Sequence, residues 1–148
     1  MEKLSIKLDQ TLNYILLKAE NQHELLIGDC RSDVKVTNTQ EHILMLLSEK
    51  QLTNSELAKH LHISQAAVTK AVKSLVRMGL LETQKDTKDA RVTYFVLTDE
   101  ARPIAEEHRH HHEETLGAYG ELLKRYSNSE KSIIYRFLDD LSKELGES

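Results

Sequence analysis

The 148-residue sequence has no tryptophan, one cysteine, one proline and only five glycines. A single cysteine cannot form a disulfide within the chain, which excludes the small disulfide-stapled class of extracellular protein. So little proline and glycine argues against disorder and against a turn-rich all-β fold. No apolar run approaches the roughly 18 residues of a membrane-spanning helix, and the first residues lack the apolar segment of a signal peptide. We expect a helical, cytoplasmic protein whose core is mostly Leu, Ile and Val.

Acidic residues outnumber basic residues overall, which gives a net charge of −4, but one segment has an excess of basic residues. From Lys59 to Arg91 there are seven Lys or Arg and three Asp or Glu, a balance of +4, so that the remainder carries −8. A basic segment within an acidic chain is typical of a surface that meets an anion such as DNA.

Apolar spacing predicts helices on both sides of this segment. In the first helix, apolar residues recur in steps of three and four from Leu4 to Ala19, and the helix is expected to end near Gly28. Further helices are predicted over 41–49, 55–61, 64–78, 99–126 and 131–145. Two strand-like runs, 80–85 and 91–97, surround a polar tip and predict a hairpin.

Local signals support several of these boundaries. Thr37, Thr53 and Ser127 are each followed three positions later by Gln or Glu, which predicts three capping boxes. Gly79 is expected to end the helix that precedes the hairpin. Pro103 should weaken or kink the first turns of the long helix, because it removes a backbone donor there.

Residues 31–98 fit a winged helix-turn-helix: two helices joined by a short turn, the second one basic, and then a hairpin. In the second helix Val68, Val72 and Leu75 face inward. The residues expected to face DNA are Ser64, Gln65, Ala66, Thr69, Lys70 and Lys73 on this helix, and Lys85, Lys88 and Arg91 on the hairpin. A winged-helix domain used only for protein contacts is the alternative.

The stretch "EEHRHHHEET", residues 106–115, holds four of the eight histidines. His108 and His112 share one helix face and can grip one ion together. Glu107 points about 100° away around the helix, and His110 and His111 are expected to be plain surface residues. A histidine-rich face is usually solvated, so these two histidines alone leave both interpretations open.

Two other polar clusters favour a metal site. "TQEHILML" supplies Glu41 and His42, and "ENQHELLIGDC" supplies Glu24 and Cys30, among others. If these clusters converge with the histidine stretch, three histidines and a carboxylate make a ligand set that zinc takes in proteins.

"DARVTYFVLT", residues 89–98, resembles the wing signature of MarR-type regulators. The resemblance implies a homodimer, with residues 1–30 and 99–146 as dimerisation helices around the DNA-binding module 31–98. It implies that Arg91 is the wing arginine and that Asp89 helps to hold it. Two recognition helices would then read a pseudo-palindromic operator in double-stranded DNA, with half-sites ~34 Å apart.

Four stretches, "ENQHELLIGDC", "TNTQEHILMLLSE", "SQAAVTKAVKSLV" and "ARPIAEEHRHHHEETL", resemble more closely the zinc-responsive branch of the MarR family in streptococci and lactococci. This resemblance implies a repressor of zinc-uptake genes that serves zinc homeostasis, with zinc as co-repressor. It implies two zinc ions per chain and no organic cofactor. The implied ligands are Glu24, His42, His108 and His112 in the first site, and Cys30, Glu41 and Glu107 in the second.

Other functions are weighed against this one. The alternative within the same class is a regulator that responds to an oxidant through Cys30 or to a small organic ligand. The sequence around Cys30 holds no basic cluster to activate the thiol, because Asp29 adjoins it as closely as Arg31. A zinc hydrolase using Glu41 or Glu107 as general base is disfavoured, because the chain lacks an H-E-x-x-H helix. We therefore expect no enzymatic activity.

Overall fold

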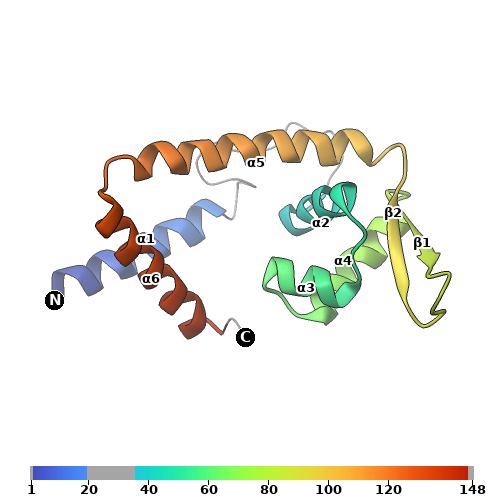
Figure 1. Cartoon of the computed structure of the whole chain (residues 1–148), viewed down its shortest axis with the longest axis horizontal. Helices are drawn as coiled ribbons and strands as arrows, with labels where there is room; N and C mark the ends of the chain where they lie inside the picture. The colour runs from blue at the N-terminus through green and yellow to red at the C-terminus, as the bar shows by residue number, and fades with distance from the viewer. Residues whose placement is uncertain (1, 20–35, 147–148) are drawn as a thin grey trace. The chain divides into compact units, whose positions relative to one another are not determined.

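The computed structural model describes residues 2–19 and 36–146. Over these residues the fold is mainly helical with one antiparallel hairpin, as predicted (Figure 1). The elements are α1 (Glu2–Ala19), α2 (Asn38–Glu49), α3 (Asn54–Leu61), α4 (Gln65–Arg77), β1 (Leu81–Lys85), β2 (Thr93–Leu97), α5 (Arg102–Leu123) and α6 (Asn128–Glu144). The predicted end of the first helix near Gly28 lies outside the described residues.

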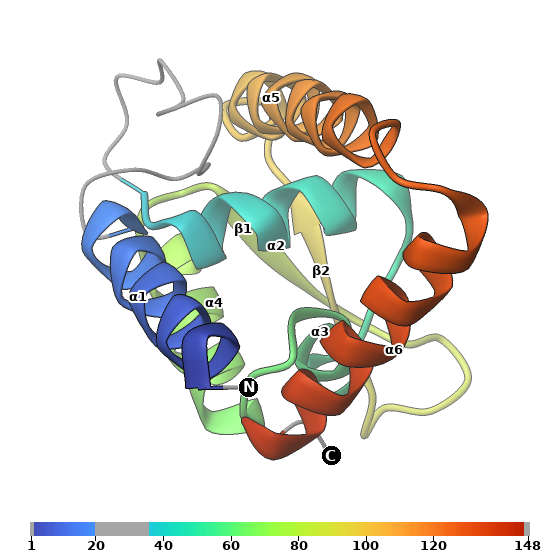
Figure 2. The ribbon, with the colours of Figure 1, turned by 90° about the vertical axis from the view of Figure 1, so that its left-hand side faces the viewer.

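The chain divides into two compact units, Met1–Thr115 and Leu116–Ser148, and the division falls inside α5. The first unit contains the core, in which α2, α3 and α4 pack together and α2 and α4 contact the hairpin (Figures 1 and 2). The side chains at its centre are fully enclosed: Ile43, Leu44, Leu57, Val68 and Leu75 are each 0% exposed. Burial of Val68, Val72 and Leu75 confirms the predicted inward face of α4.

Reciprocal hydrogen bonds start three of the helices where the sequence predicts them. At α2 the Thr37 side chain accepts from Gln40 N, and the Gln40 side chain accepts from Thr37 N. The same capping box is present at Thr53 and at Ser127. Each box satisfies backbone donors that a helix start otherwise leaves without partners.

The hairpin is anchored to the core by its first and last residues. Leu81 pairs with Leu97 across the two strands, and both are buried. Gly79 ends α4 with a φ of 75°, a left-handed conformation that glycine adopts without strain. Thr98 then donates its hydroxyl hydrogen to the Gly79 carbonyl at 2.7 Å, which ties the end of the hairpin to its beginning.

The expectation for Pro103 was wrong. The long helix begins at Arg102 rather than near Asp99, so Pro103 lies in its first turn. Backbone N–H groups in a first turn have no partner within the helix, and the proline ring therefore removes no hydrogen bond there.

α1 and α6 differ from the helices of the core, because neither contains a buried residue. Large apolar side chains are exposed along both: Leu4 is 72% and Leu16 66% exposed on α1, and Tyr135 is 76% exposed on α6. These faces are nonetheless not membrane spans, since no helix of the described residues is long and apolar enough to cross a bilayer.

Candidate functional site

The first turn of α2 carries two adjacent ionisable residues, Glu41 and His42. The Thr37–Gln40 capping box fixes where the helix starts and therefore which way these side chains point. Glu41 is only 2% exposed, and its carboxylate benefits from the positive end of the helix dipole. A charged group buried this deeply requires a partner, and α5 supplies one.

α5 presents His108 and His112 one turn apart to α2. Their rings lie nearly parallel, with centroids 6.4 Å apart and an interplanar angle of 12°. The His42 ring stands edge-on to both, with its centroid 4.3 Å from that of His108 and 5.5 Å from that of His112. Three histidines from two helices, distant in sequence, thus form one cluster within the first unit.

The environment keeps His42 neutral. Burial lowers the pKa of His42 from 6.5 to about 4, with smaller contributions from His108 and His112 in the same direction, while Glu41 opposes the shift. At neutral pH the imidazole therefore holds no second proton. A neutral imidazole is the form that binds a metal ion.

Glu41 fixes the tautomer of His108. Its Oε2 lies 2.9 Å from His108 Nδ1, and both side chains are buried. Because a carboxylate can only accept, Nδ1 is the ring nitrogen that donates in this bond, which leaves Nε2 as the ring nitrogen able to bind a metal ion. A carboxylate on the far nitrogen of a histidine is the usual support of a metal-binding imidazole.

The donor set of the cluster fits zinc, which takes neutral imidazole and carboxylate ligands. The cluster does not supply a whole site: in the described part of the chain, no three His, Cys, Asp or Glu side chains are arranged to hold a metal ion. Glu24 and Cys30, predicted for the first and second sites, lie outside the described residues. Among the ligands predicted for the second site, Glu41 forms a hydrogen bond with His108. Glu107 precedes His108 on α5 and is half-buried.

The two remaining histidines of the stretch differ from this pair. His110 is exposed and forms an ion pair with Glu114 one turn further along α5, with 3.0 Å between His110 Nε2 and Glu114 Oε1. His111 is half-buried. The first of these matches the expected surface role, whereas the second is more enclosed than the sequence indicates.

The basic face of the module lies on α4 and the hairpin. Ser64 caps α4 by accepting from Ala67 N. Ser64, Gln65, Ala66, Lys70, Lys73, Lys85, Lys88 and Arg91 are all exposed, and Thr69 is half-buried. This arrangement leaves the start of α4 available to the major groove of DNA, the groove wide enough to admit a helix.

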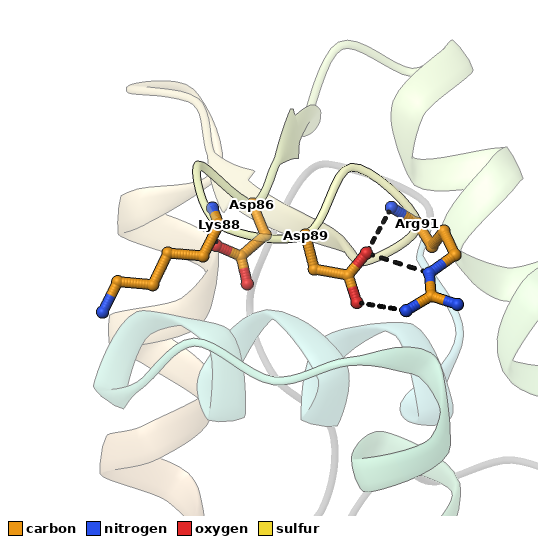
Figure 3. A network of polar contacts seen from close by, with 4 residues as sticks. All are labelled: Asp86, Lys88, Asp89 and Arg91. Atoms are coloured by element: carbon orange, nitrogen blue, oxygen red, sulfur yellow. Dashed lines mark hydrogen bonds and ion pairs between the residues drawn. The ribbon is translucent and has the colours of Figure 1, made fainter.

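The hairpin tip holds its arginine by a local network (Figure 3). Asp89 accepts from the backbone N–H of Arg91 and from its Nε at 3.1 Å and Nη2 at 3.3 Å. These bonds lower the pKa of Asp89, chiefly through the Arg91 side chain. The Arg91 side chain remains 91% exposed, and Lys88 extends away from the pair. The tip therefore offers a preset guanidinium to an anion.

Two polar contacts could not be predicted from the sequence. The Glu41–His108 bond joins residues 67 positions apart, and only the adjacency of Glu41 to His42 hints at it. Asn54, at the start of α3, donates from Nδ2 to Thr69 Oγ1 at 3.0 Å, and no feature of the sequence singles it out.

Comparisons with known proteins place this geometry in context. Residues 36–93 match the pattern of the MarR family. The chain is 62% identical to the transcriptional regulator AdcR of Streptococcus pyogenes over 98% of this chain and 99% of that protein. A crystal structure of AdcR, a zinc-dependent MarR family transcriptional regulator in the Zn(II)-bound state, superimposes with a TM-score of 0.72 at 59% identity, covering 98% of this chain and 99% of that one. The structure of Lactococcus lactis ZitR in complex with DNA superimposes with a TM-score of 0.80 at 48% identity, covering 96% of this chain and 97% of that one.

Proposed function

The chain belongs to the MarR family of transcriptional regulators, and on that premise we propose that it is a zinc-dependent repressor whose DNA binding is promoted by zinc. The observation that carries the proposal is the cluster of His42, His108 and His112. It joins α5 to α2, the helix that contacts α3, α4 and β2 of the DNA-binding module. Among its relatives, AdcR has a crystal structure in the Zn(II)-bound state, and ZitR has a structure in complex with DNA.

The ligands we propose for a first zinc ion are Glu24, His42, His108 and His112, and those for a second are Cys30, Glu41 and Glu107. Bound zinc would link His42 of α2 to His108 and His112 of α5, whose rings lie close together. The chain's own residues prepare for it: burial keeps His42 neutral, and Glu41 orients His108 through Nδ1. Two zinc ions per chain follow from these two sets.

The control of DNA binding follows from where the ligands sit. Ile43 and Leu44 of α2 belong to the same buried core as Leu75 of α4, and the two helices are in contact. A constraint on His42 therefore acts on the element that supports the recognition helix. Zinc shifts the population toward the DNA-binding arrangement by the difference in its affinity for the two arrangements and by no more. Zinc-loaded protein would repress zinc-uptake genes, and zinc shortage would release them.

We propose that the protein acts as a homodimer, with residues 1–30 and 99–146 forming the interface and residues 31–98 the DNA-binding module. The exposed apolar faces of α1 and α6 support this assignment, because such faces usually mark protein contacts. A two-fold dimer would present two copies of α4 to a pseudo-palindromic operator with half-sites ~34 Å apart. Gln65 would read base edges, and Lys70, Lys73 and Arg91 would contact phosphates or the minor groove.

The test is operator binding by fluorescence anisotropy at fixed salt, because the phosphate contribution alone changes affinity by orders of magnitude with salt. An operator duplex is first selected from random-sequence DNA with zinc-loaded protein. Chelator-stripped protein is then compared with protein given zinc stepwise. We expect zinc to raise the affinity at least about tenfold, or roughly 1.4 kcal/mol of coupling. An unchanged or lowered affinity would contradict zinc as co-repressor.

A matched pair of variants assigns the response to the cluster. His108→Ala/His112→Ala should abolish the zinc effect while helix content by circular dichroism stays unchanged. His110→Ala/His111→Ala removes two histidines from the same helix outside the cluster and should leave the zinc effect intact. Zinc-promoted binding by the first variant would rule out this ligand assignment.

A further inference from the structure

The hydroxyl of Thr69, on the second turn of α4, is committed inside the module. Its oxygen accepts from Asn54 Nδ2 at 3.0 Å, and its hydrogen is donated to the Gln65 carbonyl at 2.9 Å. A threonine hydroxyl has one hydrogen and two lone pairs. Once the hydrogen is used for Gln65, Thr69 has no donor left to offer.

This bonding changes what Thr69 is able to contact on DNA. Phosphate oxygens and the N7 and O6 atoms of guanine are acceptors, and they require a donor from the protein. Ser64 differs in this respect, because its oxygen accepts from Ala67 N and its hydroxyl hydrogen is not used in that bond. Although both residues lie on the predicted DNA-facing side, Thr69 is therefore suited to an internal role.

Asn54 reaches Thr69 from a fixed position. It is the first residue of α3 and follows Thr53, which caps that helix through reciprocal bonds with Glu56. In the described residues the Asn54 Oδ1 atom is buried without a hydrogen-bond partner, an arrangement that costs stability.

A pocket of about 550 Å³ opens beside the pair, lined by Asn54 and Thr69 together with Val72 and Val76 of α4 and Phe95 of β2. The pocket runs along α4 from Thr69 to Arg77, whereas the core side of the same helix is closely packed through Val68 and Leu75, which are each 0% exposed. Among the described residues, the Asn54–Thr69 bond is the side-chain hydrogen bond that links α3 to α4 beside this pocket.

We propose that Asn54 is a positioning residue for DNA recognition, acting through Thr69. Its bond to Thr69 sets the orientation of α4 on α3, and the Thr69 bond to the Gln65 carbonyl extends the constraint to the backbone of the first residue of α4. Gln65 then meets the base edges in register. This inference rests on the proposed DNA-binding function and names a residue that touches no DNA.

The test uses Asn54→Ala, Thr69→Val and the double variant, with zinc-loaded protein bound to the operator and to an unrelated duplex at several salt concentrations. Each single change should lower operator affinity about threefold to tenfold, the value of one hydrogen bond. The double variant should lose no more than either single variant, because both changes break one link. Affinity for the unrelated duplex and the salt slope should stay unchanged, and Thr69→Ser should restore binding.

Lys70→Ala is the control for a direct contact, since it should weaken binding to both duplexes and reduce the salt slope by about one. The inference is overturned if Thr69→Val behaves like this control, if the two losses add, or if Asn54→Ala has no effect. If urea unfolding shows that Asn54→Ala is destabilised, Asn54→Ser takes its place, because its side chain is too short to reach Thr69. Failure of the wild-type protein to bind the operator would instead contradict the proposed function.

Discussion

The winged module and the terminal helices bury their apolar residues to very different extents. The module encloses Leu57, Val68 and Leu75 completely within one chain. α1 and α6 bury nothing, although their sequences are as periodic as those of the module. Hydrophobic periodicity therefore identifies a face that requires cover, but it does not reveal whether the same chain provides it.

This difference indicates two sources of stability. The module is stabilised by contacts within the chain, and its stability should not depend on protein concentration. The terminal helices gain their burial only when another surface covers them, so that their stability depends on mass action. The following tests are ordered from the largest expected effect to the smallest.

The largest effect is expected in the module core. Leu57→Ala leaves a cavity at a fully enclosed position, and we expect a loss of about 3 kcal/mol in the free energy of unfolding. Urea denaturation followed by circular dichroism measures this loss at two protein concentrations. Ser55 lies two positions before Leu57 on α3 and is exposed. Ser55→Ala should therefore change the free energy of unfolding by less than about 0.5 kcal/mol. A small loss for Leu57→Ala would mean that the module does not depend on its own core.

The second test addresses the exposed apolar face of α1. Leu17→Asp places a charge on a side chain that is 64% exposed in the single chain. If a partner chain covers this face, burial of the charge should raise the dimer dissociation constant about hundredfold. Sedimentation equilibrium measures the constant, and Thr11→Asp adds the same charge to α1 at an exposed polar position about 120° around the helix from Leu17. Equal behaviour of the two variants would remove α1 from the interface.

The third test concerns His42, a half-buried histidine of the module. The pKa of His42 is about 4 in the folded chain and 6.5 as the ordinary value, so the unfolded state binds more protons between these values. The free energy of unfolding should therefore fall as the pH is lowered from about 6.5 to 4. For the metal-free protein we expect a decrease of about 2 kcal/mol, less than the full shift implies because solvent reaches part of the ring.

His42→Gln supplies the control for this pH dependence. Glutamine does not titrate in this range, so that the decrease in unfolding free energy should become smaller by about the same amount. Urea midpoints at pH 7, 6 and 5 make the comparison. A variant that keeps the full decrease would assign it to other groups.

The smallest effect is expected at the exposed hairpin tip, where solvent screens the Asp89–Arg91 pair. Asp89→Asn removes the charge that orients the guanidinium, and we expect operator affinity to fall about twofold to threefold. Binding to an unrelated duplex should rise slightly, because a negative charge near the phosphates is lost. Anisotropy competition measures the ratio, and an increase in specificity would contradict the orienting role of Asp89.

Local features of the fold could be predicted from the sequence, and long-range polar contacts could not. The three capping boxes and the inward face of α4 depend on residues within a few positions of each other. The effect of Pro103 was predicted wrongly, because it depends on where the helix begins, and a sequence locates helix boundaries poorly. The first turn tolerates the ring that an interior turn would not.

In the candidate site, too, local spacing could be predicted from the sequence and long-range contacts could not. The spacing of His108 and His112 is visible in the sequence, and their proximity to His42 follows only once α2 is packed on α5. The family resemblance implies that Glu41 is a zinc ligand, but the bond from Glu41 to His108 depends on tertiary packing and could not be predicted. Asn54 gives no sequence signal, because its role depends on the hydroxyl of a residue on another helix.

The capping box at Thr37 also has a consequence for how such a chain tolerates insertions and deletions. It sets the rotational phase of α2 locally, so length changes before Thr37 leave the direction of His42 unaltered. One residue inserted between Thr37 and His42 would instead rotate the imidazole by about 100° and turn it away from α5. Insertions and deletions before Thr37 are therefore compatible with the histidine cluster. Insertions and deletions within the five positions after Thr37 are not.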